Sequence, residues 1–103
     1  MPSLSELMKQ AKEVQEKIAK VQKGLESVTI EASSGGGMVK VTANGRGDIL
    51  SISIEQEVVN PEEVQILEEL ILAAVNEAAR RARDALAAEM NKLTGGIPIP
   101  GLS

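Results

Sequence analysis

The feature that most constrains the fold of this chain is a short glycine-punctuated block at residues 34–47, SGGGMVKVTANGRG. Three consecutive glycines precede a run in which apolar and polar residues alternate, and Asn44 and Gly45 follow that run. Alternation with a period of two predicts a strand, and Asn-Gly is a dipeptide that tight hairpins with positive φ prefer. The block therefore predicts the centre of a small antiparallel sheet, with a turn on each side of one strand.

The segments on both sides of this block alternate in the same way, which extends the predicted sheet to three strands. We expect these strands at about 28–33, 38–44 and 48–55, each with one apolar face. Consecutive strands would be joined by turns, which gives a meander. Neither edge strand carries a proline that would block pairing, so a second copy of the chain could extend the sheet.

A helical pattern precedes the predicted sheet. Ser3 and Glu6 have the spacing of a capping box, which predicts a helix over 4–26. Its apolar residues are Leu4, Leu7, Ala11, Val14, Ile18, Val21 and Leu25. They are spaced alternately by three and four, which is a heptad seam that requires a partner helix. On the opposite face, lysines alternate with Glu13 and Glu16, and this face is either a binding surface or an ordinary solvated one.

A second, longer helix is predicted after the sheet. Asn60 and Pro61 are a cap residue and a first-turn proline, so we expect a helix over 61–93 that ends before a Gly-Gly pair. Its first half carries large apolar residues and would lie on the sheet. Its alanine-rich second half would project and pair with the first helix, with the start of that helix beside the basic residues. The segment 94–103 is either an extended ligand for a partner or a plain tail.

Charge is distributed unevenly along this second helix. Its first half carries five acidic residues and no basic one, whereas four basic residues outnumber two acidic ones in its second half. Glu77 with Arg81 and Arg80 with Asp84 have i to i+4 spacing, so these arginines could simply stabilise an exposed helix. The alternative is that the basic half contacts phosphate groups.

Composition disfavours several classes of function. The 103 residues contain no cysteine, histidine, phenylalanine, tyrosine or tryptophan. Because imidazole and thiol groups are missing, we expect no enzyme, no metal site, no cofactor and no small-molecule substrate. The triple glycine lacks the Gly-Lys-Ser or Gly-Lys-Thr of a phosphate-binding loop, and we interpret it as a plain turn. The lack of aromatic rings disfavours recognition of single strands by base stacking.

Targeting signals are also missing from the sequence. No apolar run approaches the roughly 20 residues that span a membrane, and the first residues lack the basic and apolar regions of a signal peptide. We therefore expect a cytoplasmic protein that does not bind membranes.

Several short motifs in a fixed order make the chain resemble a known family. They are LMKQA at 7–11, the block at 34–41, Asn-Gly before an Ile-rich strand, the acidic-then-basic helix, and GGIPIPG at 95–101. Together they resemble the YbaB/EbfC family of bacterial nucleoid-associated proteins, with 1–103 as a single domain. The resemblance implies a homodimer in which a central sheet carries projecting helical arms. It also implies that the protein binds duplex DNA in the nucleoid and affects nucleoid organisation or gene expression.

Electrostatics restrict where such a protein could bind DNA. The chain has 11 basic and 15 acidic residues, and its net charge of −4 repels phosphate. We therefore predict phosphate contacts from basic residues on the helical arms, with little sequence preference. Charge placement alone gives the candidates Lys9, Lys12, Arg80, Arg81, Arg83 and Lys92, followed by Lys17, Lys20 and Lys23.

The competing hypothesis is a helical adaptor or scaffold that binds another protein through the heptad seam or the C-terminal tail. Salt-dependent binding of duplex DNA distinguishes the two hypotheses. Both require the same α+β fold, with a long N-terminal helix, a three-stranded antiparallel meander, a long C-terminal helix and an extended tail.

Overall fold

The computed structural model describes residues 3–94. Its helices and strands follow one another in the order predicted for the α+β fold. The elements are α1 (Leu4–Leu25), β1 (Thr29–Ser34), the 3-10 turn η1 (Gly35–Gly37), β2 (Val39–Asn44), β3 (Ile49–Ile54), the 3-10 turn η2 (Gln56–Val58) and α2 (Val64–Thr94). Apart from Thr94, which ends α2, the tail predicted at 94–103 lies outside the described residues.

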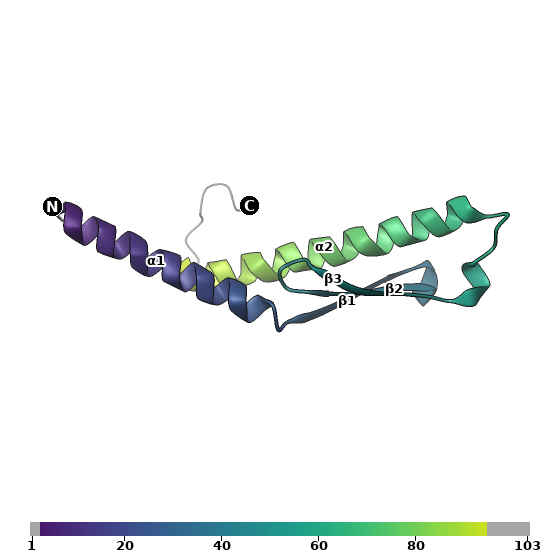
Figure 1. Ribbon diagram of the computed structural model, residues 1–103, viewed down its shortest axis with the longest axis horizontal. Helices are drawn as coiled ribbons and strands as arrows, with labels where there is room; N and C mark the ends of the chain where they lie inside the picture. Colours follow the sequence, from purple (N-terminus) through teal and green to yellow (C-terminus); the bar gives the residue numbers. More distant parts are fainter. Residues whose placement is uncertain (1–2, 95–103) are drawn as a thin grey trace.

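The molecule is elongated, measuring 68 × 23 × 18 Å. Figure 1 shows α2 lying along the sheet and continuing past it toward α1, which extends further in the same direction. We call residues 26–82 the body, which holds the sheet and the part of α2 above it. We call residues 3–25 and 83–94 the arm, which holds α1 and the last turns of α2.

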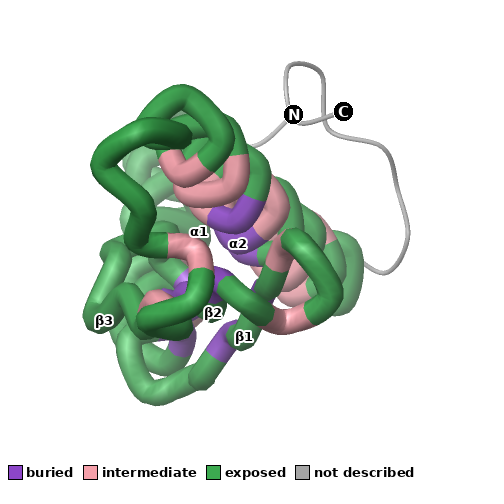
Figure 2. Tube along the Cα trace, turned by 90° about the vertical axis from the view of Figure 1, so that its right-hand side faces the viewer, coloured by how far each residue is buried: buried purple, intermediate pink, exposed green. Residues whose placement is uncertain are grey.

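A thin core lies between the sheet and α2. The strands are ordered β1-β2-β3 and antiparallel, with Ala32 opposite Val41 and Val41 opposite Ile52. Alternation places one set of side chains under α2, where β1 and β2 meet the buried Ala74 and Ala78. Figure 2 shows these buried segments facing one another across the two layers. Alanine lets the helix backbone approach the sheet closely, so the largest fully buried side chains are only the valines of β2.

Strand β3 is the part of the sheet that α2 covers least. The helix packs against β1 and β2, and Leu50 and Ile52 are 59% and 46% exposed. β3 is also an edge strand, so one row of its backbone hydrogen-bonding groups faces away from the sheet. The body therefore presents an apolar edge along β3.

Local hydrogen bonds fix the start of α1 and its junction with the body. The Ser3 hydroxyl accepts from the backbone N–H of Glu6 at 3.2 Å, which confirms the predicted N-cap. At the other end Leu25 is buried, and its carbonyl accepts from the N–H of Gly45 at 2.8 Å. A Cβ added to Gly45 would lie 2.8 Å from Leu25 Cδ2 and 2.9 Å from Leu25 O, so only glycine fits this contact.

The loop between β2 and β3 is organised by the side chain of Asn44. Its Oδ1 accepts from the N–H groups of Arg46 (3.0 Å) and Asp48 (3.1 Å), and its Nδ2 donates to Asp48 Oδ2 at 2.9 Å. The positive φ of the predicted turn occurs at Gly47, at +91°. This buried asparagine thereby satisfies the polar groups of the loop that carries Gly45.

The predicted start of the second helix is wrong. The helix begins at Val64 rather than at residue 61. Asn60 Oδ1 accepts from the N–H of Glu62 at 3.0 Å, and its carbonyl accepts from Glu63 N–H at 2.9 Å. Asparagine followed by proline thus forms a separate turn before the helix, because the same local hydrogen bonds that cap a helix can also close a turn.

Candidate nucleic-acid interface

The two helices of the arm run antiparallel. The end of α1 lies beside the middle of α2, where Leu25 lines a hollow together with Ala82 and Arg83. Further toward the start of α1, Lys17 lines a second hollow with Leu93, near the end of α2. The first half of α1 therefore extends beyond α2, as Figure 1 shows.

This arrangement overturns the predicted helix register. It is the end of α1, and not its start, that lies beside Arg83. At 1.5 Å per residue, Lys12 is about 20 Å from Leu25 along the helix, so Lys9 and Lys12 are remote from Arg80 and Arg83. The reason is the short connection between α1 and β1, together with the contact between Leu25 and Gly45, which hold the end of α1 at the sheet.

Two of the predicted arginines are engaged in ion pairs. Arg80 Nη1 lies 3.0 Å from Asp84 Oδ2, and its Nε lies 3.1 Å from Glu77 Oε2. Arg81 Nε lies 3.0 Å from Glu77 Oε1, while its Nη1 donates to the backbone carbonyl of Glu31 in β1 at 2.5 Å. The pairs expected from i to i+4 spacing are confirmed, and Arg81 also fastens α2 to the edge of the sheet.

Glu77 is held in its charged form by these neighbours. Hydrogen bonds from Arg80 and then from Arg81 lower the pKa of Glu77 from 4.5 to about 2. The same hydrogen bond raises the pKa of Arg80. At neutral pH Glu77 is therefore ionised, and its negative charge offsets part of the positive charge of the two arginines.

The remaining candidates differ in how free their charges are. Lys92 pairs with Glu89 at 3.1 Å. Arg83, Lys9 and Lys12 have no ion pair or hydrogen bond from their side chains within residues 3–94. The secondary candidates Lys17, Lys20 and Lys23 are likewise unpaired there, and all are exposed.

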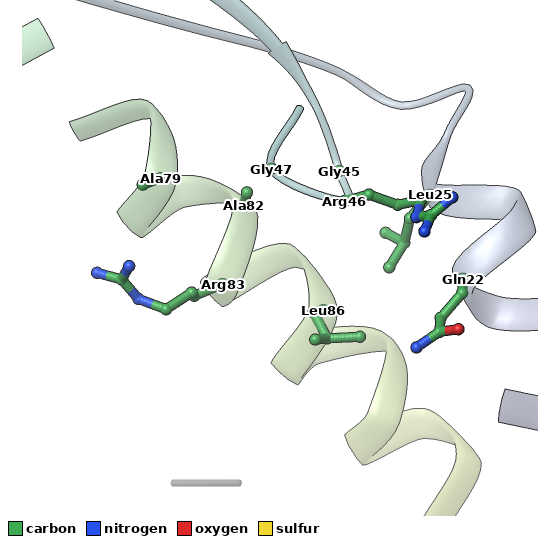
Figure 3. A pocket seen from close by; sticks show the side chains of 9 residues that line it. All are labelled: Gln22, Leu25, Gly45, Arg46, Gly47, Ala79, Ala82, Arg83 and Leu86. Atoms are coloured by element: carbon green, nitrogen blue, oxygen red, sulfur yellow. The ribbon is translucent and has the colours of Figure 1, made fainter. Parts of the chain in front are cut away.

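The hollow beside Arg83 is small and open. It measures about 360 Å³ and lies between the end of α1, the β2–β3 loop and α2 (Figure 3). In Figure 3 Arg83 points away from Arg46 and from α1, and the residue is exposed. Arg46 Nη1 is bound to Glu26 Oε1 at 2.6 Å and so ties the loop to the end of α1. The hollow is therefore part of the junction between α1 and the body, while Arg83 is exposed to solvent.

Two basic residues of the body were missed as candidates. Arg46 has the structural role just described. Lys40 lies on the outer, polar face of the sheet among hydroxyl groups, in a hollow of about 480 Å³ that it shares with Thr42 and Ser53. Its place in the alternation of β2, on the side away from the apolar residues, was the sequence signal for this exposure.

Charge divides between the two parts of the molecule. The arm carries seven basic and five acidic residues, whereas the body carries four basic and ten acidic ones. Within α1, steps of 100° per residue place Lys9 about half a turn from the apolar seam and Lys12, Lys20 and Lys23 on the same side as Lys9, whereas Lys17 lies beside the seam. The positive surface is therefore the outward side of the arm.

Residues 3–94 contain no helix long and apolar enough to cross a membrane. The same range brings no three acidic side chains together in a way that could hold a metal ion.

Comparison with known proteins gives sequence matches over almost the whole chain. The sequence model of the YbaB/EbfC DNA-binding family matches residues 1–97. The chain is 51% identical over 100 residues to a nucleoid-associated protein of Caldanaerobacter subterraneus subsp. tengcongensis, covering 97% of this chain and 90% of that protein. It is 47% identical over 100 residues to a nucleoid-associated protein of Pelotomaculum thermopropionicum, covering 97% and 95%.

The fold itself also recurs in a solved structure. The crystal structure of an uncharacterized protein from Helicobacter pylori superposes with a TM-score of 0.82, covering 92% of this chain and all of that one at 18% identity. This likeness concerns the fold, whereas the sequence matches extend over almost the whole chain. The chain belongs to the YbaB/EbfC DNA-binding family.

Proposed function

We propose that the protein binds duplex DNA as a homodimer, mainly through phosphate contacts from the arm, and takes part in nucleoid organisation and gene expression. The observation that carries this proposal is the division of charge, with a positive arm on a negative body. Its relatives are named nucleoid-associated proteins, which supports a place on the bacterial chromosome in the cytoplasm. Binding DNA in this way requires no catalytic residue.

Basic residues without an ion pair are better candidates for DNA contacts than basic residues that are already paired. Lys9, Lys12 and Arg83 can bind phosphate without breaking an ion pair inside residues 3–94. Arg80 and Arg81 must share their charge with Glu77, so their attraction to phosphate is reduced. We therefore assign the main contacts to the unpaired lysines of α1 and to Arg83, with smaller contributions from the paired arginines and from Lys92.

The uncovered edge of the sheet supports the homodimer. Leu50 and Ile52 leave apolar surface beside β3. On α2, Leu72 lies on the same flank as Ala79, since seven residues are close to two helical turns, and Ala79 lines the hollow at the β2–β3 loop. A second β3 related by a two-fold axis would extend the sheet and bury this surface. Light scattering should then give the mass of two chains, and Ile52→Lys should reduce it to one.

Gel-shift titration of duplex DNA at several salt concentrations tests the DNA contacts. The variant K9Q/K12Q/R83Q removes three unpaired charges, and the control R80Q/R81Q/K92Q removes three paired ones. Each lost phosphate contact should lower the slope of log affinity against log salt by about 0.9. We expect a large loss of affinity and slope for the first variant, and a smaller one for the control.

Two results would contradict the proposal. A greater loss in the control than in the first variant would move the interface to the paired cluster. Failure of the unmodified protein to bind duplex DNA even at low salt would instead favour the adaptor hypothesis, for which the exposed apolar seam of α1 is the supporting observation.

A further inference from the structure

The first half of α1 exposes an apolar seam that the protomer does not use. Every residue from Leu4 to Lys17 is exposed. Leu4 is 74% exposed and Val14 is 50% exposed, and they lie on one stripe with Leu7 and Ala11. Within residues 3–94 no second helix covers this stretch, since α2 ends near Lys17.

The same stripe is already a helix-packing surface further along α1. Ile18 and Val21 are partly buried, and Leu25 is almost completely buried. Val21 and Leu25 line a hollow with Leu93 of α2, so the second half of the seam packs against a helix. Because the heptad spacing continues without interruption, the exposed half has the geometry to pack against a helix as well.

The residues that border the seam indicate which helix this is. In a coiled coil, charges at the flanking positions select the partner. Between Leu4 and Ile18 these positions hold Met8, Gln10, Gln15 and Lys17, of which only Lys17 is charged. The flanks therefore neither repel an identical helix nor attract one of opposite charge. Glutamine amides both donate and accept, so two such flanks can hydrogen-bond to each other.

We propose that the seam of α1 from Leu4 to Ile18 pairs with the same seam of a second copy of this chain, and so joins one dimer to another through their arms. Lys9 and Lys12 lie on the far side of α1 and stay accessible to DNA while the seam is occupied. A dimer joined in this way at both arms could link DNA segments or neighbouring molecules on one segment.

The size of the seam sets the strength of this pairing. It spans about two heptads with one alanine in the middle, so we expect weak pairing in dilute solution. Molecules bound side by side on one DNA have a raised effective concentration, which favours pairing. This second step rests on the proposed DNA binding, whereas the pairing of arms in concentrated protein does not.

Disulfide trapping tests the pairing, since the chain contains no cysteine of its own. Ala11 lies in the middle of the seam, so Ala11→Cys brings two thiols together in either parallel or antiparallel pairing. Glu16→Cys is the matched control on the opposite, exposed face of the same helix. In a glutathione buffer, A11C should form linked chains at least about tenfold faster than E16C, owing to the higher effective concentration of thiols.

A second change identifies the cause of the linkage. Leu7→Gln and Val14→Gln on the A11C background remove apolar surface that is exposed in the protomer, so the fold should persist by circular dichroism. Linkage should then fall to the rate of E16C. Oxidised A11C should also elute as a larger assembly than the reduced protein, and long duplex DNA should increase its rate of linkage.

Several results would overturn the proposal. Equal rates for A11C and E16C would mean that the seam does not pair with itself, as expected if its occupant is a different protein. Linkage that survives L7Q/V14Q would exclude the apolar seam as the cause. A linked product of unchanged size would place the contact inside one dimer. No gain on DNA that is demonstrably bound would refute the DNA-assisted step alone.

Discussion

The body and the arm of this molecule differ in both burial and charge. The body holds the small core between α2 and two strands and carries ten acidic residues against four basic ones. The arm has a positive balance, and the first half of its α1 is entirely exposed. The difference teaches that stability and binding are carried by separate parts, so substitutions in the two parts should have separable effects.

The arginines of α2 sharpen this contrast. Arg80 and Arg81, at the end of the body, form ion pairs with acidic neighbours, whereas Arg83, two residues after Arg81, forms none among residues 3–94. Three arginines in one basic cluster thus differ in the charge they can offer to phosphate. Counting basic residues overestimates the binding surface when acidic residues lie one helical turn away.

The same substitution in the two parts gives the largest expected contrast. Val41 is 1% exposed in the central strand, and Val14 is 50% exposed in α1. Val41→Asp places an unpaired carboxylate in the core at a cost of several kcal/mol, which is comparable with the whole stability of a small domain. We expect V41D to be largely unfolded and V14D to melt within a few degrees of the unmodified protein.

Thermal unfolding followed by circular dichroism measures this contrast, at low protein concentration so that contacts between copies do not contribute. If V14D lost as much stability as V41D, the first half of α1 would have to be packed in the isolated molecule, and the division between body and arm would fail.

These regions also differ in how well the sequence predicted them. The strands and the Ser3 cap are set by residues that are close together in the sequence. Periodicity and capping chemistry were therefore sufficient to predict them. Asn60 misled because one local hydrogen-bond pattern serves both a turn and a helix start. The register of α1 on α2 depends on a contact between Leu25 and Gly45, which are far apart in the chain and share no local pattern.

The sequence predicted which basic residues make up the candidate site, but not which of their charges are free to bind phosphate. Charge placement found the basic residues of both helices. It could not decide whether Arg81 is free to bind phosphate or is engaged within the protein. Arg81 pairs with Glu77, which is a sequence neighbour, but it also donates to the carbonyl of Glu31, which is far away in the chain. Long-range contacts therefore decided which charges are free.

Glycine substitutions at the junction of body and arm should have the next largest effect. Gly45→Ala forces a Cβ to within 2.8 Å of Leu25 Cδ2 and 2.9 Å of its carbonyl oxygen. We expect a loss of about 1–3 kcal/mol from this crowding, and weaker DNA binding because the arm is displaced. The control is Gly24→Ala in α1, where a Cβ meets nothing within 4 Å.

Because alanine is the better helix former, G24A should stabilise the protein by about 0.5–1 kcal/mol. Denaturant unfolding gives both free energies. Equal effects of the two changes would mean that Leu25 and Gly45 do not hold the arm against the body.

The smallest expected effect comes from removing Glu77, the carboxylate that pairs with Arg80 and Arg81. Glu77→Gln removes a carboxylate whose pKa is about 2 in the folded chain against 4.5 ordinarily. A lowered folded-state pKa stabilises the protein above the ordinary pKa, and this stabilisation is lost as pH falls toward the folded value. The unmodified protein should therefore melt higher than E77Q above pH 4.5, and the difference should disappear between pH 4.5 and about 2.

At neutral pH the same change should strengthen DNA binding, because it releases Arg80 and Arg81 from their shared partner. If both then contact phosphate, the slope of log affinity against log salt should steepen by about 0.9 for each of them. Glu13→Gln in α1 alters net charge equally, but Glu13 forms no ion pair within residues 3–94, so it should leave the slope unchanged. Equal slopes for E77Q and E13Q would show that the ion pairs do not restrain these arginines, and the distinction between paired and free charges would then lose its bearing on DNA binding.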